Sequence, residues 1–74
     1  MIQALDTVVL TCNLPKLGLK RGEAGTVVLV HEGGAGYEVE FLTLSGETVA
    51  VTTLTKDQVR PAARGEIAHV RAMA

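Results

Sequence analysis

Glu38 and Glu40 alternate with apolar residues in the stretch YEVEF, residues 37–41. If this stretch is a β-strand, both carboxyl groups lie on one face, about 6.6–6.8 Å apart from the strand rise. That separation is within the range of an acid/base carboxylate pair. Such a pair also needs one carboxyl group in a pocket that raises its pKa. Two carboxylates on an ordinary alternating strand are more typical of a solvated face or a partner-binding face, so we predict no catalytic residue and no enzyme.

The residues that could ligate a transition metal are His31, His69 and Cys12. No two of them have the spacing of a zinc site, so the sequence predicts no metal ligand. Cys12 is interpreted as a small, half-buried hydrophobic residue. The glycines are interpreted as turn residues, because a phosphate-binding loop leads into a helix whereas Gly25 leads into a β-branched segment. We therefore predict no cofactor and no small-molecule substrate.

Size and composition indicate one small domain of 74 residues with a single cysteine. A lone cysteine cannot form an internal disulfide, which favours the reducing cytoplasm as its location. The longest apolar run is too short to span a membrane. A chain of this length buries roughly 60% of its unfolded surface, so its stability is marginal and self-association, such as a homodimer, is expected.

The charged residues are unevenly distributed, although the formal net charge is −1. Residues 23–50 contain five glutamates and no lysine or arginine, whereas the basic residues lie in the two ends of the chain. Either the ends fold over the middle, or the surface is dipolar and suits head-to-tail contact or a basic partner.

Five segments predict strands by their β-branched content and alternation. They are residues 5–11, 26–31, 37–41, 48–54 and 59–61. The second is almost wholly apolar, which indicates burial on both faces or a tight bend. The stretch EGGAG, residues 32–36, predicts a turn with glycines at positive φ, and TKDQ, residues 55–58, predicts one helical turn capped by Thr55.

This order of strands predicts an all-β fold, a small SH3-like barrel of about five strands with one helical turn before the last strand. It spans residues 1–61, and residues 62–74 form an extension, a short strand or a helix, that is a candidate oligomer interface. The Thr-rich strand at 48–55 is a candidate sheet edge, which the extension could cover or exchange with a second copy. The long loop after the first strand carries Leu14, Leu17 and Leu19, and it is expected to fold back over the core. The predicted core, with Tyr37 near its rim, consists of Val8, Leu10, Val27, Leu29, Val39, Phe41, Leu54 and Val59.

The motifs LDTVVLT, LP..GL..G..GTVV, YEVEF, TVAVTTL and VRP, within residues 5–61, resemble a family of small bacterial proteins known only as domain of unknown function 4926. That resemblance implies an SH3-like barrel and no established activity. The stretch RGEAGTVVLVH followed by YEVEF is also similar to the SH3-like domain of the nitrile hydratase β subunit, where the barrel serves in structure and assembly. The short motif GEAGTV is similar to KOW-type barrels of ribosomal and transcription proteins.

We therefore expect a non-enzymatic module that acts through protein–protein contacts or self-association. The candidate protein-binding residues are Glu38 and Glu40 on the acidic strand face, and Lys20 and Arg21 in the long loop. The alternative is a weak nucleic-acid-binding barrel of the KOW-like type. It is less favoured because the isoelectric point is about 6.0 and both aromatic side chains are predicted to point inward, away from any nucleic-acid base.

Overall fold

The computed structural model describes residues 1–73 and contains one antiparallel sheet of five strands. The strands are β1 (Thr7–Leu10), β2 (Ala24–Val30), β3 (Tyr37–Leu42), β4 (Thr48–Leu54) and β5 (Val59–Pro61), with the short 3₁₀ turns η1 (Pro15–Leu17) and η2 (Glu32–Gly34). The predicted all-β fold of about five strands is confirmed. β1 begins later than predicted, because Leu5 adopts the left-handed conformation with φ 74° and so interrupts the extended chain, and it ends one residue earlier, at Leu10.

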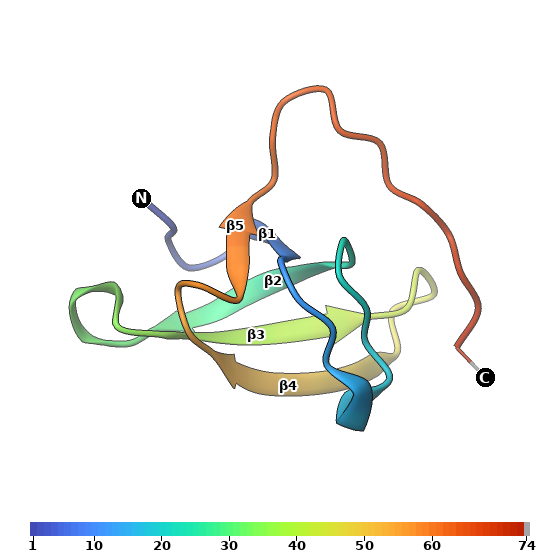
Figure 1. Cartoon of the computed structure of the whole chain (residues 1–74), viewed down its shortest axis with the longest axis horizontal. Coiled ribbons are helices and arrows are strands. Elements are labelled where there is room, and N and C mark those ends of the chain that lie inside the picture. The colour runs from blue at the N-terminus through green and yellow to red at the C-terminus, as the bar shows by residue number, and fades with distance from the viewer. Residues whose placement is uncertain (74) are drawn as a thin grey trace.

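The strand order is β4-β3-β2-β1-β5. β1 pairs with β2, β2 with β3 and β3 with β4, and β5 returns to pair with β1. In Figure 1, β2, β3 and β4 run side by side across the view, and β5 stands steeply against them. This order leaves β4 and β5 as the two edges of the sheet, so the prediction that residues 48–55 form an edge is confirmed.

A bulge in β2 decides which of its side chains face the core. Val27 lies opposite Val39, but the next registered pair is Leu29 with Glu38, so the register shifts at Val28. The extra residue reverses the alternation, as a β-bulge does, and Leu29 is 52% exposed on the face that carries Glu38. The prediction that Leu29 belongs to the core is wrong for this reason. Of the two options for this apolar segment, burial on both faces is wrong, because Val28 and Leu29 are exposed.

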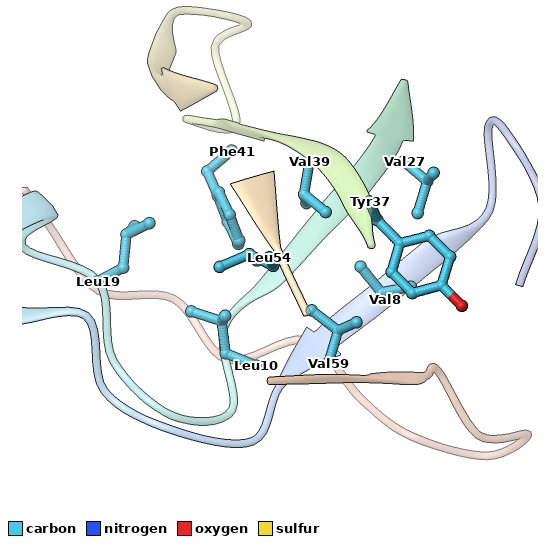
Figure 2. Packing of buried hydrophobic residues seen from close by; sticks show 9 residues of the cluster. All are labelled: Val8, Leu10, Leu19, Val27, Tyr37, Val39, Phe41, Leu54 and Val59. Atoms are coloured by element: carbon cyan, nitrogen blue, oxygen red, sulfur yellow. The ribbon is translucent and has the colours of Figure 1, made fainter. Parts of the chain in front are cut away.

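The core lies on the opposite face of the sheet (Figure 2). Its buried residues are Val8, Leu10, Leu19, Val27, Tyr37, Val39, Phe41, Leu54 and Val59. All predicted core residues except Leu29 are therefore confirmed. Leu19 comes from the long loop, as expected from a loop that folds back, and Leu14 packs beside the core while Leu17 is exposed. The ring of Tyr37 is buried, and its hydroxyl points away from the other side chains.

Gly25 is a strand residue, not the turn residue that the sequence suggested. It is buried in β2, and a Cβ atom there would lie 2.6 Å from Cγ1 of Val39 and 2.8 Å from Cε1 of Phe41. Glycine at this position lets two core side chains of β3 pack directly against the backbone of β2. In contrast, Gly33 and Gly34 in η2 have φ values of 63° and 76°, as predicted for the turn before β3.

Two further segments complete the described chain. Residues 56–58 form a single turn, closed by the Gln58 N–H donating to the Thr55 carbonyl at 3.0 Å. Residues 62–73 form neither a strand nor a helix, so the expected secondary structure is absent from this part of the extension; its last residue, 74, lies outside the described residues. The segment arches away from β5 and returns along one side of the molecule (Figure 1).

Candidate functional site

Glu38 and Glu40 lie on the face of β3 that points away from the core. The residues opposite them on β4 are Thr53 and Val51, respectively. Both carboxylates therefore lie on one face of the sheet, as predicted, and both are hydrogen-bonded to β4. Glu38 accepts a hydrogen bond from the Thr53 hydroxyl at 2.5 Å, and Glu40 accepts one from the Thr48 hydroxyl at 3.0 Å. Two cross-strand contacts thus attach β4 to β3 through side chains as well as through the backbone ladder.

Glu38 also contacts His31, which directly follows β2. The distance from His31 Nε2 to Glu38 Oε2 is 2.6 Å, and Thr53 reaches the same carboxylate oxygen. The hydrogen bond from Thr53, with that from His31 as the second cause, lowers the pKa of the Glu38 carboxyl. A general acid needs a raised pKa, so Glu38 suits a permanent negative charge better than proton transfer.

A shallow hollow of about 200 Å³ lies beside this cluster, lined by His31, Ala35, Gly36, Thr53, Leu54 and Thr55. Among residues 1–73, no three His, Cys, Asp or Glu side chains gather as a metal site would require. Cys12 is a free, partly buried thiol, as its position after β1 suggested. The cluster therefore provides a fixed, ionised carboxylate and a neighbouring imidazole, without a set of ligands around an ion.

Lys20 and Arg21 come from a different part of the fold, the loop between η1 and β2. Their backbone is fixed: the Lys20 N–H donates to Glu23 Oε1 at 2.8 Å, and the Arg21 N–H donates to Asn13 Oδ1 at 2.9 Å. Their side chains are exposed. No hydrogen bond or ion pair within residues 1–73 joins this basic pair to Glu38 or Glu40. The structure thus divides the four predicted residues into an acidic pair and a basic pair.

The outer edge of β4 is the feature of this region that the sequence indicated but could not characterise. Its seven residues, TVAVTTL, include no charged residue and no proline. Val51, at the middle of the strand, is 55% exposed. Since β4 pairs only with β3, its other side presents unpaired backbone groups to solvent.

An ion pair that the sequence did not predict connects the extension to the long loop. Arg71 pairs with Glu23, and both side chains are 27% exposed. The basic end of the chain therefore does fold over the acidic middle at this point, one of the two arrangements that the charge distribution allowed. The uneven charge distribution was the only sequence signal for this contact, and it did not identify the partners. No helix within the described residues is long and apolar enough to cross a membrane.

A family model described as Domain of unknown function (DUF4926) matches residues 4–61, which include all five strands. The chain belongs to this family. No curated protein and no solved structure matches it. The family is thus the one predicted from the motifs, whereas the likeness to the nitrile hydratase β subunit stays a prediction. The match ends at Pro61, so the extension lies outside the family domain.

Proposed function

We propose that this chain is a non-enzymatic protein-interaction module, an SH3-like barrel whose β4 edge accepts an extended strand. That strand comes from another protein or from a second copy of the chain. The single observation that carries the proposal is the unprotected outer edge of β4. In β-strand addition, main-chain hydrogen bonds along such an edge supply the affinity.

The side chains of β4 support this use of its backbone. Natural edge strands avoid unwanted pairing through charged residues, proline, bulges or very short length. Throughout Thr48–Leu54 there is neither a charge nor a proline, and its register shift lies at one end, between Phe41 and Leu42 of β3. The remaining ladder from Leu54 to Ala50 is regular, so a partner strand would meet about five residues in register.

Glu38 and Glu40 indicate what such a partner carries. A strand added to β4 lies two strand spacings from β3, about 10 Å. Long side chains span that distance, so lysine or arginine on the outer face of the added strand would be attracted to the two carboxylates. Electrostatic complementarity of this kind selects partners and register more than it adds affinity.

The same contacts support a role without catalysis. The pKa of Glu38 is lowered by the hydrogen bonds from Thr53 and His31, which opposes general-acid chemistry. Tyr37 and Phe41 are buried, so they offer no stacking surface for nucleic-acid bases. The single thiol of Cys12 fits a reducing compartment, and we propose a cytoplasmic location.

The test compares Val51→Lys with Leu29→Lys. Both replace an exposed apolar residue on the outer face, opposite Glu40 and Glu38, respectively, but only Val51 lies on the edge strand. Sedimentation equilibrium measures self-association, and a pull-down from the native host, washed at low and high salt, captures other partners. We expect Val51→Lys to weaken the association at least tenfold and Leu29→Lys to leave it within about twofold.

Three outcomes would contradict the proposal. Equal loss in both variants would locate the binding surface on the sheet face and not on the edge. A chain that stays monomeric and captures no protein dependent on Val51 would exclude strand addition. Nucleic acid that is captured at low salt and lost at high salt would instead support the KOW-like alternative, with Lys20 and Arg21 as the residues to neutralise next.

A further inference from the structure

Arg71 is bound by the long loop through three contacts. Its Nε donates to Glu23 Oε2, and its Nη2 donates both to Glu23 Oε1 at 3.0 Å and to the backbone carbonyl of Gly18. Two parallel hydrogen bonds to one carboxylate form the fork geometry that arginine provides and lysine does not. The Gly18 carbonyl adds an acceptor of fixed position to this charged pair.

The acceptors of this contact are held in place by the loop itself. Glu23 and Lys20 bond reciprocally, since the Lys20 N–H donates to Glu23 Oε1 at 2.8 Å and the Glu23 N–H donates to the Lys20 carbonyl at 3.1 Å. The Gly22 N–H donates to the Leu10 carbonyl of β1 at 2.9 Å, which fixes the loop to the sheet. Gly18 has φ 70° and ends η1. The carboxylate and the carbonyl are therefore preorganised independently of Arg71.

The segment that carries Arg71 is held much less firmly. Residues 62–70 are all exposed, and within the described chain their one backbone hydrogen bond to the sheet runs from the Ala62 N–H to the Thr7 carbonyl, at 3.2 Å. Glu66 anchors the start of the segment to Arg60, and Arg71 anchors its end. The rigid side of the contact lies inside the family domain and the loosely held side outside it. The preorganised loop thus resembles a receptor, and the loosely held extension resembles its ligand.

We infer that the loop from Gly18 to Glu23 is a receptor for an arginine side chain of an extended peptide, occupied in this structure by Arg71 of the same chain. The ligand class is a basic segment with arginine followed two residues later by an apolar residue. In this chain the apolar residue is Met73. Its Cε lies 3.5 Å from the position that a Cβ atom would take if Gly18 carried a side chain. The site is separate from the β4 edge, so neither proposal depends on the other.

A groove of about 510 Å³ extends from this contact and gives a peptide room to continue. It is lined by Asn13, Pro15, Gly18, Leu19 and Lys20. Gly18 belongs both to the groove and to the arginine contact. A peptide that supplies its own arginine would displace Arg71 and continue along this surface. The extension thus acts as a covalently attached competitor, with an effective concentration in the millimolar range for a short flexible tether.

The experiment uses the full-length chain with Arg71→Ala, which empties the receptor without touching the sheet. The amide signals of Lys20 and Glu23 are followed by NMR while a synthetic peptide of residues 62–73 is added. We expect saturable shifts of both amides in the variant and at least tenfold weaker apparent binding to the native chain. A peptide with Arg71→Lys should bind at least tenfold more weakly than the native peptide.

Two further full-length variants serve as controls. Arg64→Ala removes an exposed arginine of the same segment, so its Lys20 and Glu23 signals should match those of the native chain. Glu23→Gln combined with Arg71→Ala keeps an oxygen for the Lys20 N–H but removes the charge, and it should lose the peptide.

The inference would be overturned by any of three results. Arg71→Ala could leave the Lys20 and Glu23 amides unchanged, the lysine peptide could bind as well as the arginine peptide, or the shifts could occur away from the loop. Adding Val51→Lys to the Arg71→Ala chain should leave peptide binding unchanged. A loss of strand pairing and a loss of peptide binding can therefore be separated.

Discussion

The two edge strands of the sheet are protected to very different degrees. β5 has three residues, one of them Pro61, and its Arg60 is held in a bidentate pair with Glu66 at 2.8 and 2.7 Å. β4 has seven residues with no charge and no proline. Short length, charge and proline are the devices by which natural sheets block further pairing. One edge of this molecule is thus closed, and the other is open.

The comparison also shows where the side chains of β4 are engaged. Two of its threonine hydroxyls donate hydrogen bonds to carboxylates of the neighbouring strand β3, Thr53 to Glu38 and Thr48 to Glu40. Arg60 of β5, by contrast, reaches outward to the extension. The polar side chains of β4 therefore strengthen its attachment to β3, while its outer backbone stays available. Both properties are those that the proposed strand addition at β4 requires.

The largest expected effect concerns how firmly each edge is fixed to the core. Each edge strand contributes one buried side chain to the core, Leu54 from β4 and Val59 from β5. Leu54→Ala should lower the free energy of unfolding by about 2–5 kcal/mol, because it leaves a cavity in the core. Val59→Ala removes fewer carbon atoms and should cost about 1.5–2.5 kcal/mol. Urea denaturation of both variants measures the difference; equal values would mean that the two edges depend on the core to the same extent.

Sequence reasoning predicted the strands and most of the core, because these depend on local patterns. The strict alternation of Tyr37, Val39 and Phe41 gave the inward face of β3 correctly. The threonine-rich run at residues 48–55 indicated its edge position. Both features depend on the types of residues that lie close together in the sequence. The family model covers the same segments.

The errors arose where the backbone departs from regular geometry or where distant segments meet. Regular alternation through β2 places Leu29 in the core, and a bulge at Val28 has no distinct signature in an all-apolar run. The sequence also does not show that Gly25 is a strand residue, because its role depends on the side chains of Val39 and Phe41 in β3. The Arg71–Glu23 pair joins residues 48 positions apart, and charge balance alone does not specify such a pair.

A smaller effect is expected from opening the protected edge. Arg60→Gln removes the bidentate contact with Glu66 while preserving a polar side chain on β5, so the start of the extension should loosen. Trypsin cleavage after Arg64 and amide exchange at Ala63 should both accelerate several-fold. Lys56→Gln removes a nearby exposed cation that forms no ion pair with residues 1–73 and serves as the control. Unchanged cleavage would show that Arg60 protects β5 without holding the extension.

The smallest effect is the pH dependence of that same anchor. Hydrogen bonds from Arg60, and next from the Ala63 N–H, lower the pKa of Glu66 to about 2 from an ordinary value of 4.5. A carboxyl group whose pKa is depressed on folding stabilises the folded form above its unfolded pKa, and this contribution is lost as the pH falls toward the folded pKa. The anchor should therefore persist at pH 5 and weaken progressively between about 4.5 and 2. NMR titration of the Glu66 carboxyl carbon measures this directly, and Arg60→Gln should raise its midpoint toward the ordinary value. A native midpoint near 4.5 would mean that solvent screens the pair in solution, and the closed edge would then rest on Pro61 and on the shortness of β5.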